Sequence, residues 1–243
     1  MQTTNGQAIR AAATVVVLRE RAGAGSPDIY MVRRSARSGF MPNALVFPGG
    51  KLDAADGPAG SDAAYQAAAR RECVEESRID LGARPLRWFD TWLTPSIEPR
   101  RFLARFYLAR LDPHEGAGAA ADGHETHDGQ WAPAREFLDR SLRGELFLPP
   151  PTVTVLMRLA ESSWLTGLED APDYQTAELA APILPKWVRV PSASDPDDLQ
   201  DLIVLPHDPE YAQLAGEGAP APSRAHALPR RFLRQGFGWR LDP

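Results

Sequence analysis

Three glutamates lie close together in a segment whose composition favours an α-helix. Residues 63–76 (AAYQAAARRECVEE) consist largely of strong helix formers and contain neither glycine nor proline. Positions three and four apart share one face of a helix, so this segment gathers Glu72, Glu75 and Glu76 on one side. Their like charges repel each other. A hard divalent cation such as Mg²⁺ or Mn²⁺, which accepts carboxylate oxygens, would convert that repulsion into binding.

A pair of glycines precedes this helix. Residues 43–47 (NALVF) are expected to form a short apolar strand that stops at Pro48, and Gly49 and Gly50 then let the backbone turn tightly and approach a ligand or metal closely. Lys51 places a positive charge beside that turn. Glycines and carboxylates in this order indicate a divalent-metal site for diphosphate chemistry. For the glutamates alone, the alternative is a solvated acidic helix face.

These residues resemble the Nudix box, whose usual form is Gly, five residues, Glu, seven residues and then Arg-Glu-apolar-X-Glu-Glu-X-Gly-apolar. The matching residues, in order, are Gly50, Asp56, Arg71, Glu72, Cys73, Glu75, Glu76 and Ile79. The resemblance implies a Nudix fold of the α/β (α+β) class, in which a mixed β-sheet is sandwiched between helices. We expect the Nudix core to span residues 8–145, with a helical or mixed C-terminal extension over residues 146–243 packed on it.

The chain departs from the usual box at three places. Fourteen residues (57–70) separate Asp56 from Arg71 where the box has seven, and the extra residues are expected to form a loop before the helix. Asp56 stands where glutamate is usual, so its shorter reach affects any supporting role. Arg78 replaces the glycine that normally ends the helix, where a left-handed non-glycine residue costs about 1 kcal/mol.

The resemblance also implies the roles of individual residues. Mg²⁺ or Mn²⁺ would be held by the Gly50 carbonyl, Glu72, Glu75 and Glu76. The expected catalytic residues are Arg71, Glu75, Glu76 and Glu125. Arg71 would orient a neighbouring carboxylate, and Glu75 or Glu125 would serve as the general base. His124 and His127, on either side of Glu125, are second choices, and an ordinary polar loop is the alternative reading of that segment.

Cationic side chains provide candidates for binding substrate phosphates. They are Arg37, Lys51, Arg100 and Arg101. Arginine suits phosphate because its planar fork donates two parallel hydrogen bonds. A structural role is the alternative for each, and the preference of this chain for arginine over lysine is also explained by genome composition.

A narrower resemblance suggests the substrate. Residues 40–56 (FMPNALVFPGGKLDAAD) are similar to the branch of Nudix hydrolases that includes the peroxisomal coenzyme A diphosphatases, which also carry insertions inside the box. This resemblance implies hydrolysis of the diphosphate bond of coenzyme A (CoA) or acyl-CoA. The alternatives are a Nudix hydrolase of ADP-ribose, NADH or another dinucleotide, and a non-catalytic nucleotide-sensing module. Three converging carboxylates argue against the sensing module.

Composition limits the remaining possibilities. At 243 residues with 43% hydrophobic content the chain can bury a sizeable core, and its single cysteine, Cys73, excludes an internal disulfide and is expected to be a buried structural thiol. A net charge of −5 without a basic run argues against a nucleic-acid partner. Without an apolar run of membrane-spanning length or a secretory signal, we expect a cytoplasmic protein with no membrane partner. The extension offers a surface for a homodimer.

The apolar pattern predicts the elements that position the site. Strands are expected at residues 14–18, 29–33, 45–47, 86–93 and 101–109. Besides residues 63–76, helices are expected at residues 134–142 and from a cap at Thr152 to about Ser162. Residues 111–128 are expected to form a long loop, and long loops in compact domains are often functional.

Overall fold

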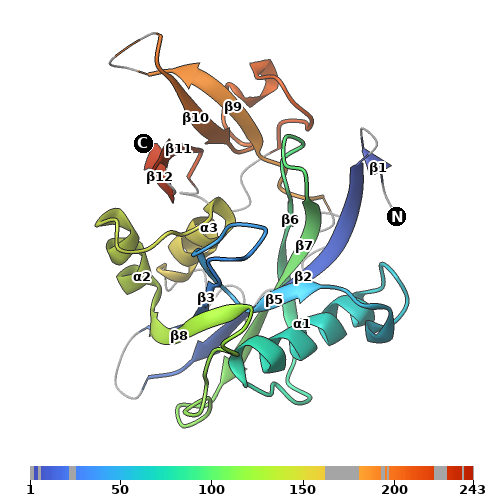
Figure 1. Ribbon diagram of the computed structural model, residues 1–243. Coiled ribbons are helices and arrows are strands. Elements are labelled where there is room, and N and C mark those ends of the chain that lie inside the picture. Colours follow the sequence, from blue (N-terminus) through green and yellow to red (C-terminus); the bar gives the residue numbers. More distant parts are fainter. Residues whose placement is uncertain are drawn as a thin grey trace.

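A mixed β-sheet forms the centre of the protein (Figure 1). The computed structural model describes residues 3–4, 7–21, 26–161, 181–192, 195, 197–221, 229–236 and 238–242. Within these residues the larger sheet has eight strands: β1 (Thr3–Thr4), β2 (Gln7–Arg19), β3 (Asp28–Arg34), β4 (Leu45–Val46), β5 (Gly49–Lys51), β6 (Arg87–Leu93), β7 (Arg101–Leu111) and β8 (Thr126–Pro133). The helices of the same part of the chain are the 3₁₀ helix η1 (Ala54–Asp56), α1 (Asp62–Ser77), α2 (Ala134–Leu142), α3 (Pro150–Leu159) and the 3₁₀ helix η2 (Tyr211–Gln213).

Strand β2 is the centre of this sheet. It pairs in parallel with β7 along eleven residues, and antiparallel with β1, β3 and β5. Successive strand residues point to opposite faces, so Val15 and Val17 pack on one side and Val16 and Leu18 on the other, all of them buried. A strand that is apolar on both faces must be covered on both faces.

Helices cover the two faces of the sheet. Ala68, Ala69 and Cys73 of α1 join the apolar cluster on the Val15 side, where their small side chains let the helix approach closely. Helices α2 and α3 supply Phe137 and Leu156 to the cluster on the other side. The predicted fold, a mixed sheet between helices, is confirmed, as is the burial of Cys73. None of these described helices is long and apolar enough to cross a membrane.

Both ends of α1 follow from local sequence. Ser61 is the N-cap, and its hydroxyl accepts a hydrogen bond from the backbone N–H of Ala64 at 3.2 Å. Arg78 ends the helix in the left-handed region with φ of 59°, and its N–H donates to the Val74 carbonyl. The helix therefore ends where the usual box has glycine, with arginine in the strained conformation that the sequence predicts.

The C-terminal part contributes a second, antiparallel sheet. Its strands, in the order β12-β11-β10-β9, are β9 (Lys186–Pro191), β10 (Leu199–Val204), β11 (Arg231–Gln235) and β12 (Gly238–Asp242). Ile203, Leu205 and Phe232 belong to the same apolar cluster as Val16 and the α3 side chains. The described part of the C-terminal region is therefore joined to the central sheet through one continuous apolar core.

Several elements differ from those expected. Strand β2 is much longer than residues 14–18, because residues 9–13 continue the pairing with β7 and Gln7 and Ala8 pair with β1, through a stretch that lacks a strong strand pattern. Residues 49–51 are not a turn but the short strand β5, which pairs with β2. Strand β8 and the second sheet were not anticipated. Helix α3 ends at Leu159, and Ser162, its expected end, lies outside the described residues.

A buried ion pair links α3 to β6. Arg158 Nη1 donates to Asp90 Oδ2 at 2.8 Å, and the two side chains are 3% and 0% exposed. Asp90 also accepts hydrogen bonds from the Trp92 indole at 3.0 Å and from the backbone N–H of Thr91. A carboxylate so deeply buried depends on these donors, because water cannot replace them.

Removing one member of this pair should be costly. Arg158→Met should lower the free energy of unfolding by about 3–5 kcal/mol, because it leaves the Asp90 charge buried and uncompensated. Urea denaturation of Arg158→Met, Asp90→Asn and the double variant measures this, and the double variant should lose less than the sum of the two. Arg189→Met, which removes an exposed ion pair with Asp201, is the control and should change stability little. An equally small loss of unfolding free energy in Arg158→Met and in the control would contradict a stabilising role of the Arg158–Asp90 ion pair.

Candidate active site

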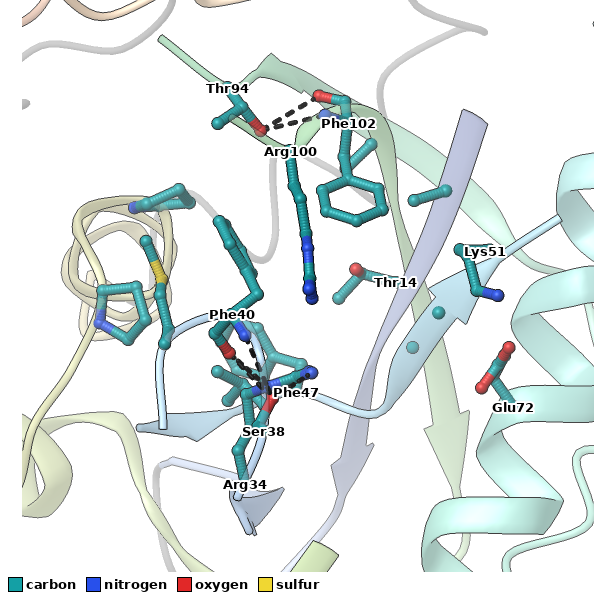
Figure 2. A pocket seen from close by; sticks show the side chains of 18 of the residues that line it. Thr14, Arg34, Ser38, Phe40, Phe47, Lys51, Glu72, Thr94, Arg100 and Phe102 are labelled. Atoms are coloured by element: carbon teal, nitrogen blue, oxygen red, sulfur yellow. Dashed lines mark hydrogen bonds between the residues drawn. The ribbon is translucent and has the colours of Figure 1, made fainter. Parts of the chain in front are cut away.

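A cleft of about 960 Å³ opens over the central sheet (Figure 2). Its floor is one face of β2 and β7, because residues that alternate along a strand share a face. The floor residues are Arg10, Ala12, Thr14, Phe102, Ala104 and Phe106. The walls are β5 and α1 on one side, the segment 34–41, and the start of α3 with Ile203 of β10. Residues far apart in the chain therefore meet around one cavity.

Glu76 is the most deeply buried carboxylate of α1 at the cleft. Its side-chain Oε2 accepts a hydrogen bond from the backbone N–H of Gly49 at 2.9 Å, and the residue is only 4% exposed. Burial raises the pKa of Glu76 to about 8, and the nearby carboxylates of Glu72 and Glu125 add to this effect, while the Gly49 hydrogen bond and Arg34 oppose it. The fold thus holds Glu76 where a cation would favour its charged form.

Glu72 packs against Gly50, one helical turn before Glu76. A Cβ atom on Gly50 would collide with the Glu72 carboxylate, so only glycine permits this approach. Gly49 is similarly enclosed by the backbone of Ala13 and Thr14. Both glycines serve for close approach and not for a left-handed turn, since neither has positive φ. Burial raises the pKa of Glu72, which Arg71 partly offsets.

Arg71 connects the carboxylates that surround it. Its guanidinium donates to both oxygens of Asp56, at 3.1 and 2.9 Å, and to the Lys51 carbonyl at 3.0 Å. It also donates to Glu72 Oε1 at 2.8 Å and Glu75 Oε2 at 3.1 Å. Asp56 lies in η1, which contacts α1, so its short side chain can reach Arg71. Arg71 therefore fixes the orientation of Glu72 and Glu75 relative to β5.

The loop after β7 brings a fourth carboxylate to the site. Glu125 lines the cleft and is close enough to Glu72 and Glu76 to raise the pKa of each. Asp122 shapes this loop by accepting hydrogen bonds from the backbone N–H groups of His124, Glu125 and Thr126. Backbone hydrogen bonds also tie the loop to its neighbours, from Ser35 N–H to the Glu125 carbonyl and from Ala120 N–H to the Ser77 carbonyl.

The donors at this end of the cleft suit a hard divalent cation. Glu72, Glu76 and Glu125 interact electrostatically, all offer oxygen, and Gly50 exposes its backbone beside them. Within the described residues, however, no three His, Cys, Asp or Glu side chains are already arranged around a common metal position. Arg71 donates hydrogen bonds to two of the carboxylates, Glu72 and Glu75.

The expected phosphate-binding residues divide into two groups. Arg37, Lys51 and Arg100 line the cleft. Arg101 does not: its buried side chain donates from Nε to the Thr94 carbonyl at 3.0 Å and forms an ion pair with Glu217 at 3.0 Å. The interpretation of Arg101 as a phosphate ligand is corrected, because its position in β7 directs it away from the cleft, opposite to Phe102.

Other lining residues were not expected from the sequence. Arg10 lies on the cleft floor, and its alternation with Ala12 and Thr14 was the available signal. Phe40 and Phe102, whose ring centroids are 5.5 Å apart, form an aromatic pair in the cleft. Of the two histidines beside Glu125, His124 lines the cleft, whereas His127 lies in β8 outside it.

Comparison with known families agrees with this geometry. Residues 8–150 match the family model described as NUDIX domain, which is more than half of the chain. The chain therefore belongs to the Nudix family.

Individual relatives are more distant. A Caenorhabditis elegans protein that bears the name nudix hydrolase 7 is 29% identical over 168 residues, covering 55% of this chain and 56% of the relative. The chain thus matches little more than half the length of that relative. The crystal structure of a NUDIX hydrolase from Alicyclobacillus acidocaldarius superposes with a TM-score of 0.59 at 26% identity, covering 70% of this chain and 99% of that one.

Asp122 should give the loop that carries Glu125 a stability that depends on pH. Burial by itself would raise the pKa of Asp122, but the N–H donors of Thr126, Glu125 and His124 outweigh it and hold the pKa below the usual 3.8. A depressed pKa stabilises the fold above the unfolded value, and this stabilisation is lost as pH falls through the folded pKa. Asp122→Ala should cost about 1–2 kcal/mol at pH 7.

Urea unfolding of both proteins between pH 7 and pH 3 measures this difference. The gap between wild type and Asp122→Ala should shrink as the pH falls below about 3.8. Asp112→Ala is the matched control, since the Asp112 carboxylate makes no hydrogen bond to the described residues, and its effect should be small at every pH. If the difference in unfolding free energy between wild type and Asp122→Ala does not change with pH, the stabilisation comes from packing and not from the charge of Asp122.

Proposed function

We propose that the protein is a divalent-metal-dependent hydrolase of the diphosphate bond in a nucleoside diphosphate-linked substrate. The observation that carries this proposal is the approach of the α1 carboxylates to Gly49 and Gly50 at the wall of the cleft. A cavity of about 960 Å³ has room for a ligand of dinucleotide size. Membership of the Nudix family and the similarity to two Nudix hydrolases support the same reaction class.

The residues of the site suit this reaction. Glu72 and Glu76, with the Gly50 carbonyl and with Glu75 as a further ligand, would hold Mg²⁺ or Mn²⁺. Such a cation neutralises charge on the diphosphate oxygens and lowers the pKa of a bound water. Glu125, which lines the cleft near Glu72 and Glu76, would accept a proton from the attacking water; Glu75 is the second candidate for that role. Arg71 orients Glu72 and Glu75 through its hydrogen bonds.

Lys51 and Arg37 would bind phosphate oxygens at the cleft wall. Lys51 directly follows the glycines of β5, so its charge lies beside the carboxylates without pairing to any of them within the described residues. Charge-assisted hydrogen bonds to phosphate orient the substrate and offset its negative charge.

CoA or acyl-CoA is the substrate that we favour. The sequence similarity over residues 40–56 to the coenzyme A diphosphatase branch supports it, and this segment supplies Phe40, Met41 and Phe47 to the cleft. With Pro149 and Ile203, these side chains give the cleft an apolar portion that would accommodate an acyl or pantetheine chain. ADP-ribose, NADH and other dinucleotides are the alternatives within the same chemistry. A homodimer remains part of the proposal.

A substrate panel tests the proposed reaction. With Mg²⁺ or Mn²⁺, chromatography of CoA and acetyl-CoA reactions should show phosphopantetheine products and adenosine 3′,5′-bisphosphate, and EDTA should stop their formation. ADP-ribose, NADH and diadenosine polyphosphates complete the panel. Cleavage of one of these instead would keep the mechanism and change the substrate. No turnover on any substrate, combined with ligand-induced thermal stabilisation, would favour the non-catalytic sensing module.

Glu76→Gln tests the site itself. The variant should lose roughly 100-fold or more in kcat, since it removes a charge placed to hold the cation. It should still fold, because the glutamine amide oxygen can accept the Gly49 hydrogen bond. Steady-state kinetics on the best substrate and a thermal melt measure the two effects. Glu136→Gln, which changes an exposed side chain of α2, is the control. Wild-type kcat in Glu76→Gln would remove Glu76 from the site.

A further inference from the structure

Arg100 is a cation in the cleft without a partner. Figure 2 shows its side chain extending into the cleft from the segment before β7, beside the rings of Phe40 and Phe102. Within the described residues its guanidinium forms no ion pair and no hydrogen bond, and the residue is exposed. By contrast, Arg34 in the same cleft donates to Ser38 Oγ at 3.0 Å and to the Phe40 carbonyl at 3.1 Å. Arg100 therefore retains all its hydrogen-bonding capacity.

The structure makes room for the Arg100 guanidinium at Gly39. A Cβ atom at Gly39 would collide with Arg100 Nη1 and would also crowd Cζ and Nη2. The backbone of Gly39 is not in the positive-φ region, so no conformational need for glycine accounts for this residue. The missing side chain lets Arg100 reach across the cleft from the β7 side to the segment 34–41.

Arg10 places a second unpaired cation at the same end of the cleft. Its Cα lies opposite Phe102 in the parallel pairing of β2 and β7, only two residues along from Arg100. Arg10 is exposed and lines the cleft, and it too has no ion-pair partner in the described part of the chain. Two cations that line one cleft without ion-pair partners favour an anionic ligand, because a bound anion offsets both charges.

This pair lies away from the carboxylate end. Gly50 pairs with Ala13 of β2, three residues further along the strand than Arg10. At the rise of a β-strand, three residues correspond to roughly 10 Å. Arg100 precedes Arg101, which pairs with Ile9 of β2, so the backbones of Arg10 and Arg100 both lie toward the start of β2, away from Gly50 and Lys51.

We propose that Arg10 and Arg100, with Gly39 making room for Arg100, form a second anion site that binds a phosphomonoester carried on the nucleotide ribose. The proposal rests on the proposed function and deepens it, because it names the substrate class: nucleotides that bear a ribose phosphate in addition to the scissile diphosphate. CoA and NADPH have this group, whereas 3′-dephospho-CoA, NADH and ADP-ribose do not.

Binding measurements test the site without turnover. Thermal shift and isothermal titration with adenosine 3′,5′-bisphosphate and with AMP should show at least about 10-fold tighter binding of the bisphosphate to wild type. The double variant Arg10→Met/Arg100→Met should bind the two nucleotides equally, and Arg189→Met, remote from the cleft, should behave as wild type. Equal affinity of wild type for the two nucleotides would overturn the proposal.

Kinetics separate this proposal from the proposed function. For wild type, kcat/KM should be at least about 10-fold higher for CoA than for 3′-dephospho-CoA. The same comparison of NADPH with NADH shows whether the position of the ribose phosphate matters. Turnover of CoA and its dephospho form with equal kcat/KM would overturn the anion site and keep the hydrolase. Discrimination in binding without any turnover would keep the anion site and overturn the hydrolase.

Gly39→Ala provides a variant that keeps both arginines. The new methyl group meets only the flexible end of Arg100, so the fold should be retained while the guanidinium is displaced. The preference for CoA over 3′-dephospho-CoA should fall toward unity, because kcat/KM should fall more for CoA than for the dephospho form. If Gly39 has only a structural role, Gly39→Ala should lower kcat/KM for CoA and for 3′-dephospho-CoA by the same factor or leave both unchanged. Either result would remove Gly39 from the proposal.

Discussion

The contact between β5 and α1 constrains the rest of the structure. Gly49 donates its N–H to Glu76, and Gly50 leaves the space that the Glu72 carboxylate fills. Helix α1 can come so close because alanines face the sheet, and β5 stays extended because it pairs with β2. The buried carboxylates therefore depend on three features at once: small helix residues, two glycines in β5, and the central position of β2.

Electrostatics divides the cleft into two regions. Near β5, carboxylates face one another, and burial raises the pKa values of Glu72 and Glu76. Arg71 offsets part of this repulsion, and Asp56 in turn holds Arg71. Further along β2, arginine side chains line the cleft without carboxylate partners among the described residues. Because the carboxylates gather at one end of the cleft, an extended ligand with several charged groups should bind in one direction in preference to the other.

The sequence predicted the fold class and helix α1 better than the pairing of distant strands. Helix α1 and the position of its glutamates follow from helical spacing, which is a local property. Glu125 was placed from family resemblance, and the structure brings it near Glu72 and Glu76. Arg101 was assigned wrongly because one register step along β7 decides whether a side chain faces the cleft or the protein interior. Strand β8 pairs with β3, and in the second sheet β10 pairs with β11; both pairings join segments distant in the chain, which local patterns do not report.

The wall formed by Ile203 has a consequence for how the protein responds to a ligand. Ile203 belongs both to the lining of the cleft and to the apolar core that joins β10 to α3 and the central sheet. A ligand that binds only the folded state stabilises every element whose opening would destroy its binding site. Amide hydrogen exchange in β10 should therefore slow when the cleft is filled, although the carboxylates lie on another element. The C-terminal sheet thus registers the occupancy of a site to which it contributes no charged group among the lining residues.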